Sequence, residues 1–133
     1  MAGHRKTALI VDLDESALIS LQSILEDDGV DTTTTWDTGE ALTLLRAGHY
    51  DVVLVAEHPP EICCSVFLRQ LRGRGERIPV VLLQSTPRHP FETPYLKSLD
   101  TYAVLPKYDR QAIAEAVRRC TTRFMQLDQR NEA

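Results

Sequence analysis

Basic charge, cysteine and long apolar runs are all scarce in this sequence. Its 133 residues carry a formal net charge of −4, so the chain lacks the basic field that draws a protein to nucleic acid. No apolar run reaches the roughly 18 residues that a membrane helix needs. The polar segment Met1 to Lys6 also lacks the apolar stretch of a signal peptide. We therefore expect a cytoplasmic protein that binds neither nucleic acid nor a membrane.

The three cysteines are poorly placed for a metal site or a disulfide framework. Cys63 and Cys64 are adjacent and Cys120 lies far away, and an odd number in a cytoplasmic chain indicates free thiols. Adjacent cysteines, even with His58 nearby, lack the two-residue gap of common zinc sites. The sequence identifies neither a base nor an orienting group for a catalytic thiol. We therefore expect no metal, no cofactor and no catalytic residue, and adjacent cysteines that fill apolar space.

Short apolar or β-branched runs alternate with segments of helical periodicity along the chain. The runs predict five strands, at 7–11, 30–36, 52–56, 80–83 and 101–105. Most of these runs are apolar throughout, which is typical of a parallel sheet buried on both faces. The sequence therefore predicts a doubly wound α/β domain, whose functional crevice lies beyond the carboxyl ends of the strands.

Helix signals fall between the expected strands. Asp14 and Asp109 are placed to cap the first and last helices, and Asp37 with Glu40 forms a capping-box pattern. A third helix is expected over 65–72. Its expected apolar set is Val66, Phe67, Leu68 and Leu71.

One stretch breaks this pattern. Three prolines lie between Ser85 and Leu99, and a proline inside a helix costs roughly 3 kcal/mol. We expect a loop there, followed by at most a short helix that starts near Pro94 with Thr93 as its cap.

The last helix is expected to run beyond the folded domain. We place the domain at 6–121, and an extension of the last helix with a frayed tail at 122–133. Apolar residues in this helix are spaced four, three, four and three apart: Ile113, Val117, Cys120, Phe124 and Leu127. Such a stripe packs against the sheet up to Cys120, and beyond it can pair with another helix. A homodimer through this end is therefore a hypothesis.

Landmark residues recur at the ends of the expected strands. They are Ile10-Val11-Asp12, Tyr50-Asp51, Pro60, Ile78-Pro79-Val80-Val81, Tyr102 and Pro106. In their joint spacing, from about Lys6 to Arg119, they resemble the CheY-like receiver domain of bacterial two-component response regulators. The resemblance implies a five-stranded, flavodoxin-like fold of three layers, α/β/α, and a role in phosphorelay signalling.

The resemblance also implies a chemistry that this chain is not equipped to perform. Receivers accept a phosphoryl group on a carboxylate after the third strand, with Mg²⁺ held by acids after the first strand. A hydroxyl after the fourth strand and a lysine after the fifth complete the site. Asp12 matches the first acid, whereas the second acid, the acceptor, the hydroxyl and the lysine are replaced by Leu13, Ala56, Gln84 and Leu105. We interpret the chain as a degenerate pseudo-receiver without an acceptor aspartate or a balancing cation.

Two carboxylates near the degenerate position keep alternatives open. Glu57 follows Ala56 and could mimic the charged state or act as a displaced acceptor, although strand alternation turns it away from the side of Ala56. Asp12 alone is too little for a dedicated Mg²⁺ site, and we expect it to hydrogen-bond free amides of the first helix. Tyr102 matches an aromatic switch position, and we expect a static packing or surface residue that could anchor a partner.

These interpretations predict a non-catalytic signalling domain. We expect phosphorylation-independent binding of a signalling protein, through the crevice rim or the segment from Ser85 to Leu99. One alternative is a receiver that still accepts phosphate through Glu57 or Asp12. Another is a small flavodoxin-like enzyme, which the lack of a glycine-rich phosphate loop after the first strand opposes. The length leaves no room for an attached output domain, so we expect the domain to act alone or to come from a larger regulator.

Overall fold

The computed structural model describes residues 5–85 and 101–132 of the chain. The strands in these ranges are β1 (Thr7–Val11), β2 (Asp31–Thr35), β3 (Val52–Ala56), β4 (Val80–Gln84) and β5 (Ala103–Pro106). The helices are α1 (Glu15–Asp27), α2 (Thr38–Ala47), α3 (Cys64–Gly73) and α5 (Arg110–Glu132). The short helix predicted near Pro94, with Thr93 as its cap, lies outside the described residues.

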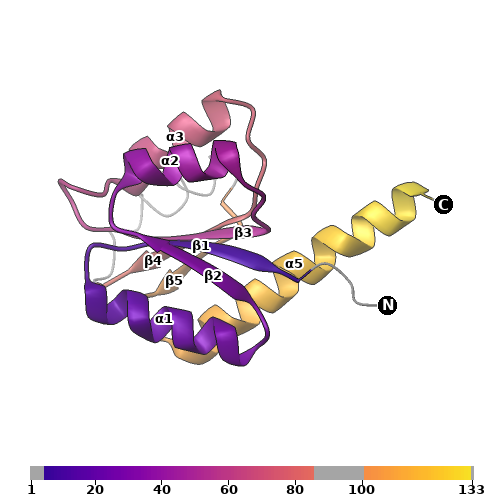
Figure 1. Ribbon diagram of the computed structural model, residues 1–133, viewed down its shortest axis with the longest axis horizontal. Coiled ribbons are helices and arrows are strands. Elements are labelled where there is room, and N and C mark those ends of the chain that lie inside the picture. Colours follow the sequence, from indigo (N-terminus) through magenta and orange to yellow (C-terminus); the bar gives the residue numbers. More distant parts are fainter. Residues whose placement is uncertain (1–4, 86–100, 133) are drawn as a thin grey trace.

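The five strands form one parallel sheet in the order β2-β1-β3-β4-β5. Figure 1 shows that α2 and α3 cover one face of this sheet, while α1 and α5 cover the other. The predicted three-layer, doubly wound fold is therefore confirmed. Val11 pairs with Thr35 and Val55, and Gln84 pairs with Pro106, so the carboxyl ends of the strands meet at one edge.

Burial follows the apolar content of the strands. All five residues of β3 are buried, as are four of five in β1 and in β4. The threonine-rich β2 lies at the edge of the sheet, where its middle residues are only partly buried. An edge position suits threonine, because its branched carbon favours a strand while its hydroxyl keeps access to water.

Aspartates begin three of the helices, as the sequence predicted. Asp14, Asp37 and Asp109 each accept a hydrogen bond from a main-chain N–H in the first turn of α1, α2 and α5, at 2.9–3.1 Å. The predicted capping box is only half formed. The Asp37 N–H donates to the Thr35 hydroxyl oxygen, and that hydroxyl donates to Glu40. Glu40 therefore supports the cap through Thr35 instead of contacting the main chain of Asp37.

Two apolar clusters fill the space between the sheet and its helices. The cluster beneath α2 and α3 contains Val55 and Phe67, and the cluster beneath α1 and α5 contains Leu54 and Ile113. The expected apolar set of α3 was wrong in one member, because Val66 is 42% exposed. The helical period places the remaining members on one face and Val66 on the opposite face.

The last helix is the longest element. α5 continues to Glu132, and Figure 1 shows that its C-terminal part extends past the sheet. None of the helices in the described ranges combines the length and the apolar composition needed to cross a bilayer.

Candidate functional site

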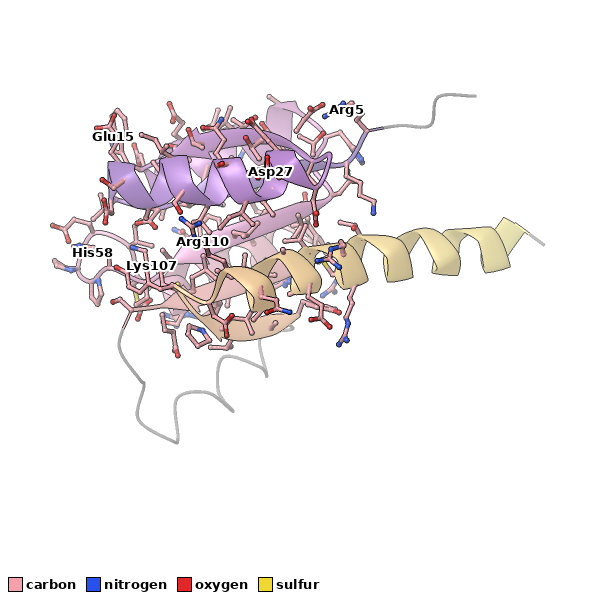
Figure 2. The ribbon with its side chains drawn as sticks, turned by 90° about the horizontal axis from the view of Figure 1, so that it is seen from below. Arg5, Glu15, Asp27, His58, Lys107 and Arg110 are labelled. Atoms are coloured by element: carbon pink, nitrogen blue, oxygen red, sulfur yellow. The ribbon has the colours of Figure 1, made fainter. Side chains whose placement is uncertain are left out.

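The carboxyl ends of the strands bring the predicted site residues to one edge of the molecule. Figure 2 labels Lys107 at this edge, together with Glu15 at the start of α1 and His58 after β3, whereas Arg5 and Asp27 mark the opposite end. The polar centre of the edge is a contact between the residue after β1, Asp12, and the residue after β5, Lys107.

Asp12 and Lys107 form a buried ion pair. Asp12 has no exposed surface and Lys107 is 7% exposed. The Lys107 Nζ lies 3.1 Å from Oδ1 and 3.0 Å from Oδ2 of Asp12. Only the contact with Oδ1 has hydrogen-bond geometry. Oδ2 accepts no hydrogen bond from the described residues and is held by charge alone.

The same Asp12 carboxylate also contacts the start of α1. Its Oδ1 accepts the main-chain N–H of Asp14 at 3.0 Å. We had expected Asp12 to bond the free amides of the first helix. It bonds instead the residue that caps this helix, one step before the helix begins. Asp12 therefore links the end of β1 to both the α1 cap and Lys107.

The resemblance to receiver domains did not predict the lysine of this site. We expected Leu105 at the lysine position and no cation to balance Asp12, and this expectation of a crevice without a cation was wrong. Leu105 packs on the cluster beneath α1 and α5, while Lys107 supplies the ammonium from two residues further along. Lys107 lies in the turn that follows β5, and its long side chain reaches the Asp12 carboxylate from there. The signal was present in the order Leu-Pro-Lys.

The residues at the predicted acceptor and second-acid positions are apolar in their surroundings as well as in type. Ala56 ends β3 with no exposed surface, inside the cluster beneath α1 and α5. Leu13 packs against the cluster on the other face of the sheet. Neither side chain offers an oxygen for a phosphoryl group or a metal ion.

Glu57 is bonded to the start of α3. Its Oε1 accepts the main-chain N–H of Cys64, the first residue of this helix, at 2.8 Å. The cap residue Cys63 makes no side-chain capping bond of its own. Glu57 therefore satisfies an amide that the helix leaves unpaired, and its negative charge lies at the positive end of the helix dipole.

The remaining predicted positions lie at the ends of β4 and β5. The Gln84 carbonyl oxygen accepts the Lys107 N–H at 2.7 Å, while its buried side-chain nitrogen has no hydrogen-bond partner within the described ranges. Tyr102 is partly buried and packs on the cluster beneath α1 and α5. Pro106 is exposed and pairs with Gln84 at the end of the sheet.

The two adjacent cysteines differ sharply in environment. Cys64 is buried, and this burial raises the pKa of its thiol to about 12. Cys63 is only partly buried; a hydrogen bond with the Ser65 hydroxyl, at 3.3 Å, lowers the pKa of its thiol, and the Val66 N–H lowers it further. His58 is exposed. Within the part of the chain that the structure describes, no three His, Cys, Asp or Glu side chains gather closely enough to hold a metal ion.

Mg²⁺ is the metal that the receiver resemblance implies, and the residues of this crevice do not fit it. Mg²⁺ takes oxygen ligands in octahedral geometry and dehydrates reluctantly, so it needs carboxylate oxygens with room for several bound waters. Asp12 is fully buried and both of its oxygens face the Lys107 Nζ. Leu13 and Ala56 add no side-chain oxygen. The positive charge of the crevice is therefore carried by lysine.

Comparisons of the whole chain with known proteins find similar solved structures. Neither a family model nor a curated protein sequence matches the chain. Among solved structures, the signal receiver domain of an HD domain-containing protein from Pseudomonas fluorescens Pf-5 is similar at a TM-score of 0.83 and 24% identity, over 98% of this chain and 96% of that one. The receiver domain of Francisella response regulator 1452 is similar at a TM-score of 0.82 and 21% identity, over 90% of this chain and 98% of that one.

A third structure was solved with a ligand. The response regulator TrrA from Thermotoga maritima, in complex with Mg²⁺-BeF, is similar at a TM-score of 0.75 and 22% identity, over 86% of this chain and 98% of that one. Identities this low establish the fold alone. The chain described here has the fold of response regulator receiver domains.

Proposed function

We propose that this protein is a receiver-like signalling domain that acts by binding a protein partner and is not itself phosphorylated. Its setting would be a two-component or phosphorelay pathway in the bacterial cytoplasm. The observation that carries the proposal is the composition of the crevice. The methyl group of Ala56 stands at the predicted acceptor position, and the Asp12 carboxylate is paired with Lys107.

The two carboxylates that could replace the acceptor, those of Asp12 and Glu57, both have bonding partners in the structure. Asp12 has no exposed surface, so a phosphodonor could reach it only after the ion pair with Lys107 had opened. Glu57 accepts a hydrogen bond from the first amide of α3. Phosphoryl transfer requires an accessible nucleophile and neutralisation of the transferred charge. These contacts support a site without phosphoryl chemistry.

Exposed aromatic residues support a role in protein binding. Trp36, directly after β2, is 69% exposed, and Tyr108, shortly after β5, is 71% exposed. β2 and β5 are the two outermost strands, so these aromatics flank the carboxyl edge on opposite sides of the sheet. Tyr108 also borders a groove of about 200 Å³ against α1. Exposed Trp and Tyr are the residue types that most often anchor protein interfaces.

A second copy of the chain is one candidate partner. α5 continues to Glu132 and extends past the sheet, and on sequence spacing Phe124 and Leu127 continue the stripe of Ile113, Val117 and Cys120. Pairing of two such helices would cover this stripe.

The proposed absence of phosphorylation is tested with a small-molecule phosphodonor. The protein is incubated with acetyl phosphate and Mg²⁺, and its intact mass is recorded before and after treatment with base. We expect an unchanged mass, because in the described ranges Ala56 stands at the predicted acceptor position and the Asp12 carboxylate is buried. A receiver domain with an intact acceptor aspartate, treated in parallel, must show the base-labile phosphoryl adduct.

A stoichiometric, acid-stable and base-labile adduct on this chain would overturn the proposal. The variants Glu57→Gln and Asp12→Asn then identify the acceptor, since the adduct disappears only when its own carboxylate is removed. Loss of the adduct in Glu57→Gln would establish the displaced-acceptor alternative.

A further inference from the structure

The Lys107–Asp12 pair joins segments that are 95 residues apart in the sequence. Both charges are buried, and the Lys107 N–H also donates to the Gln84 carbonyl oxygen at 2.7 Å. The pair therefore fixes the connection between β5 and α5 against the ends of β1 and β4. Because removing one partner of a buried pair leaves the other charge uncompensated, each charge depends on the other.

A buried carboxylate that stays charged requires a cation, and an ammonium and a divalent ion make different demands on the site. A divalent ion needs several oxygen ligands around it. In the described residues, the neighbouring positions after β1 and at the end of β3 carry Leu13 and Ala56, both packed against apolar clusters. An ammonium needs no ligand set, and Lys107 reaches both oxygens of Asp12, at 3.1 and 3.0 Å.

We infer that the Lys107 ammonium takes the place of a divalent cation in this receiver fold, neutralising Asp12 in a crevice whose other residues cannot hold Mg²⁺. The crevice would then keep one arrangement at any Mg²⁺ concentration. The inference goes beyond the proposed function, because a partner could be bound with or without this ion pair. The two are also tested by different measurements, metal binding here and phosphoryl incorporation above.

Three variants test the inference. Lys107→Met removes the ammonium but keeps an unbranched side chain, and Asp12→Asn/Lys107→Met removes both charges. Arg118→Met is the matched control, because it breaks an ion pair with Asp28 in which the arginine side chain is 58% exposed. The melting temperature of each protein is measured with and without Mg²⁺, and Mn²⁺ binding is measured by isothermal titration calorimetry.

We expect the unmodified protein to bind no Mn²⁺ and to show no melting shift with Mg²⁺. Lys107→Met should melt lower by roughly 10 °C or more, because Asp12 is left buried and unpaired. Mg²⁺ should not restore the melting temperature of this variant, because Leu13 and Ala56 add no oxygen ligand to that of Asp12. The double variant should melt above Lys107→Met and ignore Mg²⁺, and Arg118→Met should stay within a few degrees of the unmodified protein.

Several outcomes would overturn the inference. Stoichiometric Mn²⁺ binding or Mg²⁺ stabilisation of the unmodified protein would mean that the crevice accepts a metal ion beside Lys107. Recovery of Lys107→Met by Mg²⁺ would mean that Asp12 can hold a divalent ion without further side-chain ligands. If Lys107→Met does not fold, the double variant decides: its recovery supports the pairing, and its failure means that Lys107 serves packing instead.

Discussion

Cys63 and Cys64 are adjacent in the chain, but the pKa values of their thiols are shifted in opposite directions. The Ser65 hydroxyl and the Val66 N–H lower the pKa of the partly buried Cys63 thiol, whereas burial raises the pKa of Cys64 to about 12. The thiolate is the reactive form. We therefore expect iodoacetamide, in limiting amount at neutral pH, to alkylate Cys63 of the native protein well before Cys64 or Cys120. Peptide mass spectrometry after quenching measures the order.

The Cys63→Ser variant is the control for this prediction. It should lose almost all native-state alkylation, and denaturant should restore modification of the two buried cysteines. The rate at Cys63 should rise with pH at a midpoint below that of an ordinary cysteine, since its pKa is lowered. Alkylation of Cys64 or Cys120 as fast as Cys63 in the native protein would contradict the environments described here.

Single residues show where sequence reasoning reached its limit. The burial of Ala56 in apolar surroundings could be foreseen, because its residue type and its place at the end of a buried strand decide it. The role of Lys107 could not be read from family spacing, since the ammonium comes from the far side of Pro106 on a long, flexible side chain. The bond from Cys64 to Glu57 was equally hidden, because it depends on the path of the chain between β3 and α3.

Individual helices and strands were more predictable than their side-chain contacts. β1 and β3 follow from uninterrupted apolar runs, and the aspartate caps follow from local hydrogen-bond chemistry that needs no tertiary information. Glu40 and Val66 departed from expectation for tertiary reasons. Glu40 accepts a hydrogen bond from the Thr35 hydroxyl at the end of β2. Val66 faces solvent because the period of α3 turns it away from the sheet.

The extended α5 leads to a prediction about assembly. If two copies pair through the stripe that Phe124 and Leu127 continue, the protein should be a dimer at micromolar concentration. Phe124→Glu/Leu127→Glu should be monomeric, because two buried glutamates per helix would repel and lose solvation. Light scattering coupled to size-exclusion chromatography measures the mass.

Gln111→Glu is the matched control in the same helix, since Gln111 is exposed on the part of α5 that packs on the sheet. It adds a negative charge outside the stripe and should leave the dimer intact. A monomeric unmodified protein, or a double variant that remains dimeric, would exclude α5 as the contact.

For the whole molecule, the two buried thiols report on the two layers of the core. Cys64 lies in the cluster beneath α2 and α3, and Cys120 in the cluster beneath α1 and α5. Burial raises the pKa of these thiols from 9.0 to about 12 and about 11. Above pH 9.0 the unfolded chain loses these protons while the folded chain keeps them. The free energy of unfolding should therefore fall as pH rises beyond 9.0, by at most about 1.4 kcal/mol per pH unit for each thiol.

Urea unfolding at a series of pH values measures this slope, and Cys64→Ala and Cys120→Ala assign it. Each variant should be less stable at neutral pH, because a small cavity replaces the sulfur. Each should also lose stability less steeply between about pH 9 and pH 11, since one thiol no longer contributes. Tyrosines and lysines titrate in the same range but are common to all three proteins, so the difference in slope isolates the thiols. Equal slopes in the unmodified protein and both variants would mean that neither layer keeps its thiol protonated at alkaline pH.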